Sequence, residues 1–127
     1  MNKKIFIVDD DLQIRTMLEK AFKKAGYAVQ SAESAEEALK ILEKEKYQVM
    51  FLDLKLPKMD GVELCRKIRK DNPIGIIYAI TGYASLFELA DCREAGFDDY
   101  FKKPVEIKIL LKAAQDAYDK IDRWKKR

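Results

Sequence analysis

Three acidic residues follow apolar segments of this 127-residue chain in a pattern that suits divalent-metal chemistry. Asp9 and Asp10 come directly after the apolar residues 5–8, and Asp53 ends the segment VMFLD. Carboxylates crowded together raise one another's pKa, whereas a divalent cation neutralises them. An all-oxygen ligand set, in a chain without histidine, favours Mg2+ over zinc. We therefore expect these three residues to share a magnesium ion.

Two further polar pairs follow apolar segments later in the chain. Thr81 and Gly82 follow IIYAI, and Lys103 and Pro104 follow DYFK. Each feature alone has an ordinary structural interpretation, because Asp often caps a helix, Thr-Gly often forms a turn, and Lys before Pro often lies in a solvated loop. Together, a hydroxyl and an ammonium complement a cluster of carboxylates around a cation.

Apolar and amphipathic segments alternate along the whole chain. The strands are predicted at residues 4–8, 27–31, 48–52, 75–80 and 98–102. The helices are predicted at residues 12–25, 35–46, 61–71, 84–95 and 105–125. Five repeats of strand and helix predict an α/β fold, with a mostly parallel sheet covered by helices on both faces. Ligands of such sheets bind at the carboxyl ends of the strands, where the polar residues above would converge.

Local signals support the helix boundaries. In the first predicted helix a buried stripe is expected from the i, i+3, i+4 spacing of its apolar residues. Those residues are Ile14, Met17, Leu18, Ala21, Phe22 and Ala25. Gly26 stands where a C-terminal cap belongs, Ser34 with Glu37 forms a capping box, and Asp60 with Glu63 makes a comparable start. Asp11, at the entry to the first helix, is expected to be either its cap or a first-turn acid that favours the helix dipole.

The net charge of +3 is confined to the C-terminal end. Residues 118–127 contain five basic and two acidic side chains, so the rest of the chain is neutral. We interpret this segment as a basic helix end or the start of a linker. Specific DNA binding by this chain alone is not expected.

Composition excludes a membrane span, because no apolar run approaches the ~20 residues required. No secretory signal is visible at the N-terminus, so a cytoplasmic location is expected. Cys65 and Cys92 lack the paired spacing of a metal or redox site and are interpreted as packing residues.

The motifs IVDDD, FLDLKLPKMDG, AITGYA and DDYFKKP resemble, in type and order, the receiver domain of two-component response regulators (CheY-like). The resemblance covers residues 3–120 and assigns residues 1–125 to one receiver domain. It implies a doubly wound, flavodoxin-like fold with a five-stranded parallel sheet in the order 2-1-3-4-5.

Carried over by position, the resemblance makes Asp53 the phosphoacceptor and Thr81 and Lys103 the residues that hold phosphoryl oxygens. The implied Mg2+ ligands are the carboxylates of Asp10 and Asp53, Asp9 mainly through metal-bound water, and the backbone carbonyl of Lys55. Tyr100 matches the aromatic switch position of the family, so Thr81 and Tyr100 are the expected switch residues. The Lys103–Pro104 peptide bond is expected to be cis.

The resemblance also implies partners. With no histidine in the chain, the phosphoryl group would come from a histidine kinase or a histidine phosphotransfer protein. Phosphorylation would change the surface of the fourth helix, fifth strand and fifth helix, and so control an output partner, an output domain or a dimer. Such a domain is not an enzyme in the usual sense, since it catalyses only its own phosphorylation and dephosphorylation.

Three alternative functions fit the sequence less well. A Mg2+-dependent phosphatase or phosphotransferase with an Asp nucleophile usually has a second Asp two residues later, where this chain has Lys55. A flavin or nucleotide binder would need a glycine-rich phosphate loop such as GxGxxG. A receiver that signals without phosphorylation would not need the full set of acids, Thr and Lys.

Lys55 and Tyr83 occupy the two positions that flank the path of the hydrolytic water in the family. Neither carries a carboxylate or amide to orient that water, and Tyr83 is bulky enough to obstruct it. Slow loss of the phosphoryl group is therefore expected, unless both side chains simply point into solvent.

Overall fold

The computed structural model describes residues 3–82 and 85–126, apart from the side chain of residue 87. Strands and helices alternate as predicted, with boundaries within two residues of those expected. They are β1 (Lys4–Val8), α1 (Leu12–Lys24), β2 (Ala28–Ala32), α2 (Ala35–Lys44), β3 (Val49–Asp53), α3 (Gly61–Asp71), β4 (Ile76–Thr81), α4 (Leu86–Ala95), β5 (Asp99–Lys102) and α5 (Ile107–Lys125).

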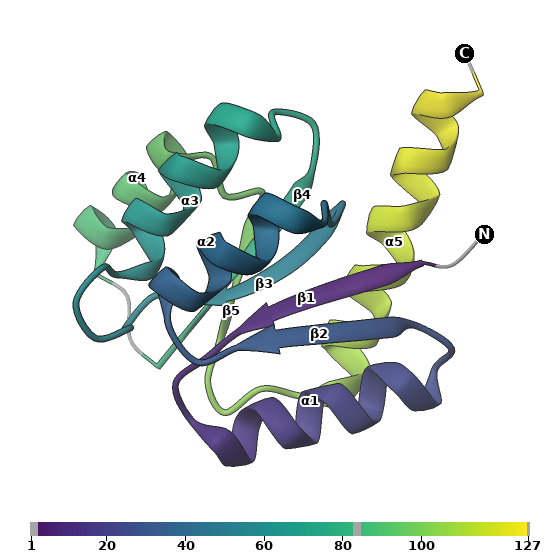
Figure 1. The fold of residues 1–127 in the computed structure, drawn as a ribbon, viewed down its shortest axis with the longest axis horizontal. Helices are drawn as coiled ribbons and strands as arrows, with labels where there is room; N and C mark the ends of the chain where they lie inside the picture. The colour runs from purple at the N-terminus through teal and green to yellow at the C-terminus, as the bar shows by residue number, and fades with distance from the viewer. Residues whose placement is uncertain (1–2, 83–84, 127) are drawn as a thin grey trace.

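The five strands form one parallel sheet in the order β2-β1-β3-β4-β5, as the resemblance implied (Figure 1). The strand order reverses between β1 and β3, which are hydrogen-bonded neighbours. Ile5 pairs with Val49, and Val8 pairs with Leu52. This register places the residues that follow β1 beside the end of β3, so the reversal point and the candidate ligands coincide.

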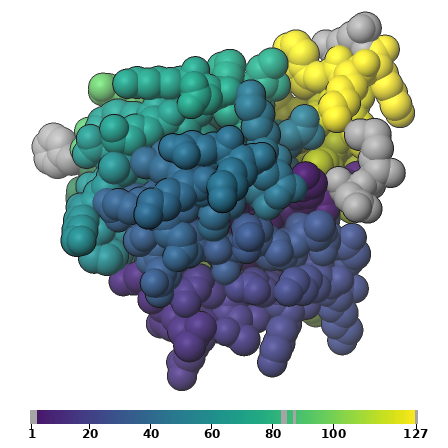
Figure 2. All heavy atoms as spheres, viewed as in Figure 1, coloured from purple at the N-terminus to yellow at the C-terminus, as the bar shows by residue number. Residues whose placement is uncertain are grey.

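Alternate residues of the central strands build two separate cores. Ile5 and Ile7 face the side covered by α1 and α5, whereas Phe6 and Val8 face the side covered by α2 and α3. Side chains of α2 and α3 fill the surface in front of the sheet in Figure 2. Because β1, β3 and β4 are buried on both faces, their sequences are continuously apolar.

Helix α1, at the β2 edge of the sheet, departs from the predicted burial pattern. Leu18 and Phe22 of α1 are buried, but Met17 and Ala25 are exposed, so the predicted stripe was too wide. Helix α1 packs beside the edge strand β2, and this edge offers too little sheet to cover a third row of side chains.

Most predicted helix ends are confirmed. Gly26 has φ +99°, a left-handed conformation that glycine adopts without a steric penalty. The Ser34 hydroxyl and the Asp60 carboxylate accept hydrogen bonds from the backbone N–H groups of Glu37 and Glu63. A reciprocal capping box would require the Glu37 carboxylate to accept a hydrogen bond from the N–H of Ser34. The carboxylate instead accepts from the N–H of Glu33.

Both cysteines are buried and unbonded to each other, as expected of packing residues. Burial raises the pKa of the Cys65 thiol to about 12, which keeps the thiol protonated. Within the described residues, no helix combines the length and apolar character needed to cross a lipid bilayer.

Candidate functional site

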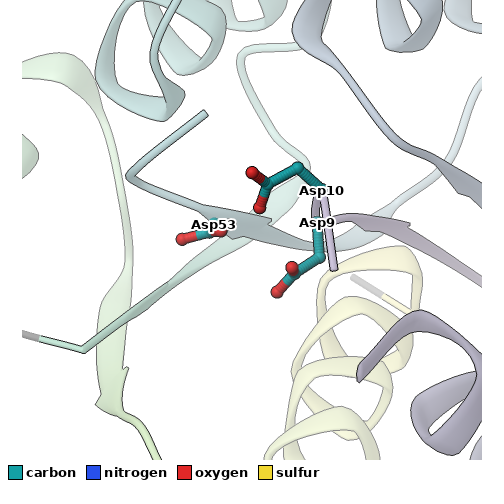
Figure 3. A group of neighbouring side chains, drawn as sticks. All are labelled: Asp9, Asp10 and Asp53. Carbon is teal, nitrogen blue, oxygen red and sulfur yellow. The ribbon is translucent and has the colours of Figure 1, made fainter. Parts of the chain in front are cut away.

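The three predicted carboxylates converge at the carboxyl ends of β1 and β3. Oxygen atoms of Asp9, Asp10 and Asp53 all lie within 4.8 Å of one another, and Figure 3 shows the side chains extending into one space. Asp9 and Asp53 are buried, whereas Asp10 is exposed. The cluster therefore has one open side, through which a cation or an anion can reach it.

Local hydrogen bonds fix the position of Asp9. Its Oδ1 accepts from the backbone N–H of Asp11 at 2.9 Å, and its carbonyl accepts from Arg15 Nη1 at 2.8 Å. The third acid of the triplet has a different role, because Asp11 Oδ1 caps α1 by accepting from the N–H groups of Gln13 and Ile14. The predicted cap at Asp11 is confirmed.

Asp53 is held by the loop that follows it. Its Oδ1 accepts from the backbone N–H of Lys55 at 3.1 Å. Behind the loop, the N–H of Gly61 donates to the Leu54 carbonyl at 3.0 Å, so α3 begins directly against this backbone. A Cβ on Gly61 would lie 2.2 Å from the Asp53 carbonyl oxygen, far inside any real contact.

Gly61 is thus a functional residue that sequence reasoning missed. Its signal was present in the segment MDG, where a glycine follows the capping Asp60 at the first position of a helix. Glycine has no intrinsic advantage inside a helix, so its presence there indicated a close backbone approach.

One cation lies between two of the acids. Lys103 Nζ is 3.1 Å from Asp9 Oδ2 and 3.4 Å from Asp53 Oδ2. The backbone N–H of Lys103 donates to the Thr81 carbonyl at 2.8 Å, which links the ends of β4 and β5. The Lys103–Pro104 peptide bond is cis.

Burial governs the electrostatics of this cluster. Desolvation and the nearby charge of Asp9 raise the pKa of Asp53 to about 6. The Lys55 N–H and the Lys103 ammonium lower this pKa, but by less. Burial also disfavours the ammonium of Lys103, but the charges of Asp53 and Asp9 outweigh it and raise the pKa of Lys103. The single ammonium of Lys103 therefore does not balance the negative charge of the three carboxyl groups.

Thr81 ends β4, whereas Tyr100 is the second residue of the neighbouring strand β5 and pairs with Ala79. Thr81 is fully buried at the end of β4, while the side chain of Tyr100 on β5 is 43% exposed. Tyr100 lines a surface hollow together with Leu89, Ala90 and Arg93 of α4. The two predicted switch residues therefore lie on neighbouring strands, Thr81 buried and Tyr100 exposed.

Lys55 has a partner that the sequence did not reveal. Its ammonium is 3.1 Å from Glu88 Oε2, in the first turn of α4, although 65% of the Lys55 side chain is exposed. This ion pair connects the loop after Asp53 to α4, so Lys55 does not simply extend into solvent. Tyr83, the other predicted lifetime position, lies outside the described residues.

Comparison with known proteins places this geometry in a family. Residues 5–115 match the response regulator receiver domain. The chain belongs to that family. It is 41% identical over 116 residues to the alkaline phosphatase synthesis transcriptional regulatory protein PhoP of Bacillus subtilis, a match that covers 89% of this chain and 48% of PhoP.

Solved receiver structures agree closely with the fold. A CheY-like receiver domain protein of Methanospirillum hungatei superposes with a TM-score of 0.93 at 36% identity, covering 97% of this chain and 98% of that one. Chemotaxis protein CheY4 of Vibrio cholerae gives 0.88 at 28% identity, covering 92% and 99%. A further relative, known by sequence, is the probable transcriptional regulator ycf27 of Porphyridium aerugineum. It is 35% identical over 121 residues, which cover 95% of this chain and 50% of ycf27.

The receiver domain spans about half the length of the curated relatives that it matches. The family assignment confirms the predicted receiver fold and favours a two-component signalling function over the phosphatase or phosphotransferase alternative.

Proposed function

We propose that this receiver domain accepts a phosphoryl group on Asp53 and that phosphorylation changes the surface formed by α4, β5 and α5. The observation that carries this proposal is the position of Asp53. It is a buried carboxylate that shares one small space with two other acids and lies 3.4 Å from an ammonium.

The donor set fits a magnesium ion. Asp9 Oδ2 is buried and has the Lys103 ammonium at 3.1 Å as a partner, and a carboxylate oxygen beside one ammonium keeps a lone pair for a further ligand. Asp9, Asp10, Asp53 and the backbone carbonyl of Lys55 would hold the ion, all through oxygen. When bound, Mg2+ would neutralise the carboxylates and the charge of the incoming phosphoryl group.

The chemistry needs an ionised nucleophile in line with the donor. With a pKa of about 6, Asp53 is mostly ionised at neutral pH. One of its oxygens attacks the phosphorus, an O–P bond forms as the N–P bond of a partner phosphohistidine breaks, and that electron pair returns to the imidazole nitrogen. Lys103 counters the charge that develops, and the Thr81 hydroxyl bonds a phosphoryl oxygen.

The proposed switch follows from the positions of Thr81 and Tyr100. Movement of Thr81 towards the phosphoryl group would open space at the end of β4, and the exposed ring of Tyr100 would turn inward. That rearrangement would alter the face that binds an output partner, an output domain or a second copy. The cognate donor would be a histidine kinase or phosphotransfer protein in the cytoplasm, where free cysteines stay reduced.

Phosphorylation by a small donor tests the proposal. The chain is incubated with acetyl phosphate and Mg2+, and its intact mass is measured. We expect the parent to gain one phosphoryl group and Asp53→Asn to gain none. Asp11→Asn is the matched control, because asparagine also caps helices and Asp11 lies outside the three-acid cluster.

An undiminished mass gain in Asp53→Asn would overturn the assignment of Asp53. Loss of phosphorylation in both variants would indicate a general structural defect, which a melting temperature of Asp53→Asn equal to or above that of the parent would exclude.

A further inference from the structure

The amino end of the sheet, opposite the phosphorylation site, carries a groove of about 750 Å³ between the last turns of α5 and the loop from α3 to β4. Both segments lie at the same end of the molecule in Figure 1, where α5 is yellow. Two large apolar side chains in the groove wall are mostly exposed, Ile74 at 80% and Trp124 at 64%. Buried Ile76 and Ile121 continue the apolar surface inward.

The loop that presents Ile74 is fixed by its own hydrogen bonds. Asn72 Oδ1 accepts from the N–H of Gly75 at 3.0 Å, and Asn72 Nδ2 donates to the Tyr47 carbonyl at 2.9 Å. Arg69 donates to the carbonyls of Asn72 and Pro73, both at 3.3 Å. An isoleucine displayed on an ordered loop loses little freedom on binding, so the surface is organised before any partner arrives.

Positive charge surrounds this apolar surface. Lys46, Lys120 and Lys125 border the groove, together with two acids. One of these acids, Asp98, forms an ion pair with Arg69, with 2.9 Å between Oδ2 and Nη2. The charge of Asp71 alone then offsets the charges of the three lysines. The basic C-terminal stretch is thus one wall of an apolar groove with excess positive charge.

We propose that this amino-end groove binds a peptide segment of a partner protein in which an aromatic or branched aliphatic residue is flanked by Asp or Glu. Interfaces commonly combine such an apolar anchor with a complementary polar rim. Single-stranded nucleic acid fits less well, because successive bases require several stacking surfaces and Trp124 is the single aromatic side chain among the described residues that line the groove.

The groove is remote from Asp53, so the proposal does not depend on phosphorylation. Peptide binding and the mass gain with acetyl phosphate are separate measurements, and either can fail alone.

A displayed library of short random peptides tests the proposal. The library is selected on the whole chain after depletion on the Ile74→Ser/Trp124→Ser double variant, and one enriched peptide is then synthesised. We expect enriched peptides to contain an apolar anchor with an excess of acids. The Kd of the synthetic peptide should rise about tenfold in Trp124→Ala or Ile74→Ser, and about threefold in Lys120→Glu.

Matched controls separate groove binding from general effects. Leu12→Ser removes an exposed apolar side chain near the opposite end of the sheet, and Lys108→Glu reverses an exposed charge at the other end of α5. Both should leave the Kd unchanged. Because the substituted groove side chains Ile74 and Trp124 are exposed, the melting temperatures of their single variants should stay close to that of the parent.

The proposal is overturned if no peptide is enriched, if enriched peptides lack acids, or if the groove variants bind as the parent does. Two direct measurements cover the other occupants. Sedimentation that shows self-association abolished by Trp124→Ala would assign the groove to a second copy, and Trp124-dependent binding of oligothymidylate would assign it to nucleic acid; either result would also overturn the proposal.

Discussion

At the carboxyl end of the sheet, the ammonium of Lys103 contacts two of three clustered carboxylates, whereas at the amino end the guanidinium of Arg69 has hydrogen-bond acceptors for all its nitrogen atoms. Arg69 donates to the Gly96 carbonyl through Nε at 2.9 Å and Nη2 at 2.6 Å, and its Nη2 also contacts Asp98 Oδ2 at 2.9 Å. Its Nη1 bonds the carbonyl of Gly75 and two others of the same loop.

The difference separates stability from function within one sheet. The Arg69 network satisfies partly buried polar groups and connects α3, the loop before β4 and the end of α4. The acidic cluster instead retains an imbalance of charge that a cation or a phosphoryl group would change. A region with satisfied partners keeps its arrangement, and a region with excess charge responds to a ligand.

Replacement of Arg69 by methionine is expected to have the largest effect. It would leave several backbone carbonyls without this donor and the Asp98 carboxylate with only the backbone N–H of Ile77, at a cost of about 3 kcal/mol in the free energy of unfolding. Denaturant titration measures the loss. Arg66→Met, an exposed arginine on the same helix, is the control and should change stability by less than about 0.5 kcal/mol. Equal losses in the two variants would contradict the role assigned to Arg69.

Gly61→Ala should come next. The new Cβ would push α3 away from the Asp53 carbonyl, and we expect a loss of about 2 kcal/mol in unfolding free energy. Phosphorylation by acetyl phosphate should also slow, because the displaced backbone carries the nucleophile. Gly82→Ala has open space for its Cβ and provides the stability control. A Gly61→Ala protein with parental stability and phosphorylation rate would show that the close approach is unimportant.

Asp53→Asn should stabilise the metal-free protein above pH 6, by about 1 to 2 kcal/mol. The folded-state pKa of Asp53 is raised from 3.8 to about 6, so the stability conferred by its proton is present below about pH 4 and lost as the pH rises through about 6. The amide avoids that loss. Unfolding curves of both proteins from pH 4 to 8, with chelator, should diverge only as the pH rises. A constant difference across this range would contradict the raised pKa.

The smallest effects are expected at the Lys55–Glu88 ion pair. Lys55→Asn should shorten the lifetime of the phosphorylated protein several-fold, a barrier change of about 1 kcal/mol, because it removes a cation that stabilises the phosphoryl group. Glu88→Gln releases Lys55 and should lengthen that lifetime. Decay of phosphorylated protein, freed of donor and kept in Mg2+, is followed by intact mass, with Glu94→Gln as control. Changes in the same direction for both variants would rule out this competition.

The sequence was sufficient to predict the features that depend on local pattern. Continuous apolar runs identified the central strands β1, β3 and β4, and Asp11 and Gly26 marked the ends of α1. The acids, Thr81 and Lys103 could be placed together because the carboxyl ends of parallel strands meet at one edge. Met17 was placed wrongly in the core because periodicity does not tell how far a sheet extends.

The remainder depends on contacts between distant segments. Arg69 and Asp98 are 29 positions apart, and nothing local distinguishes them from other surface charges. The same holds for Lys55 and Glu88, which meet only because α4 packs beside the loop after β3. Such pairs follow from the packing of side chains, which periodicity and capping signals do not specify.

The most direct test of the central claim is the Mg2+ dependence of stability in the parent and in Asp10→Asn. If crowded carboxylates bind the ion, Mg2+ at several times its Kd should stabilise the parent by about 1 kcal/mol, following RT ln(1 + [Mg2+]/Kd). Asp10→Asn should be more stable than the parent in chelator and gain much less from Mg2+, because it has one like charge and one ligand fewer. A variant that is no more stable without metal, yet gains as much from Mg2+ as the parent, would contradict the account.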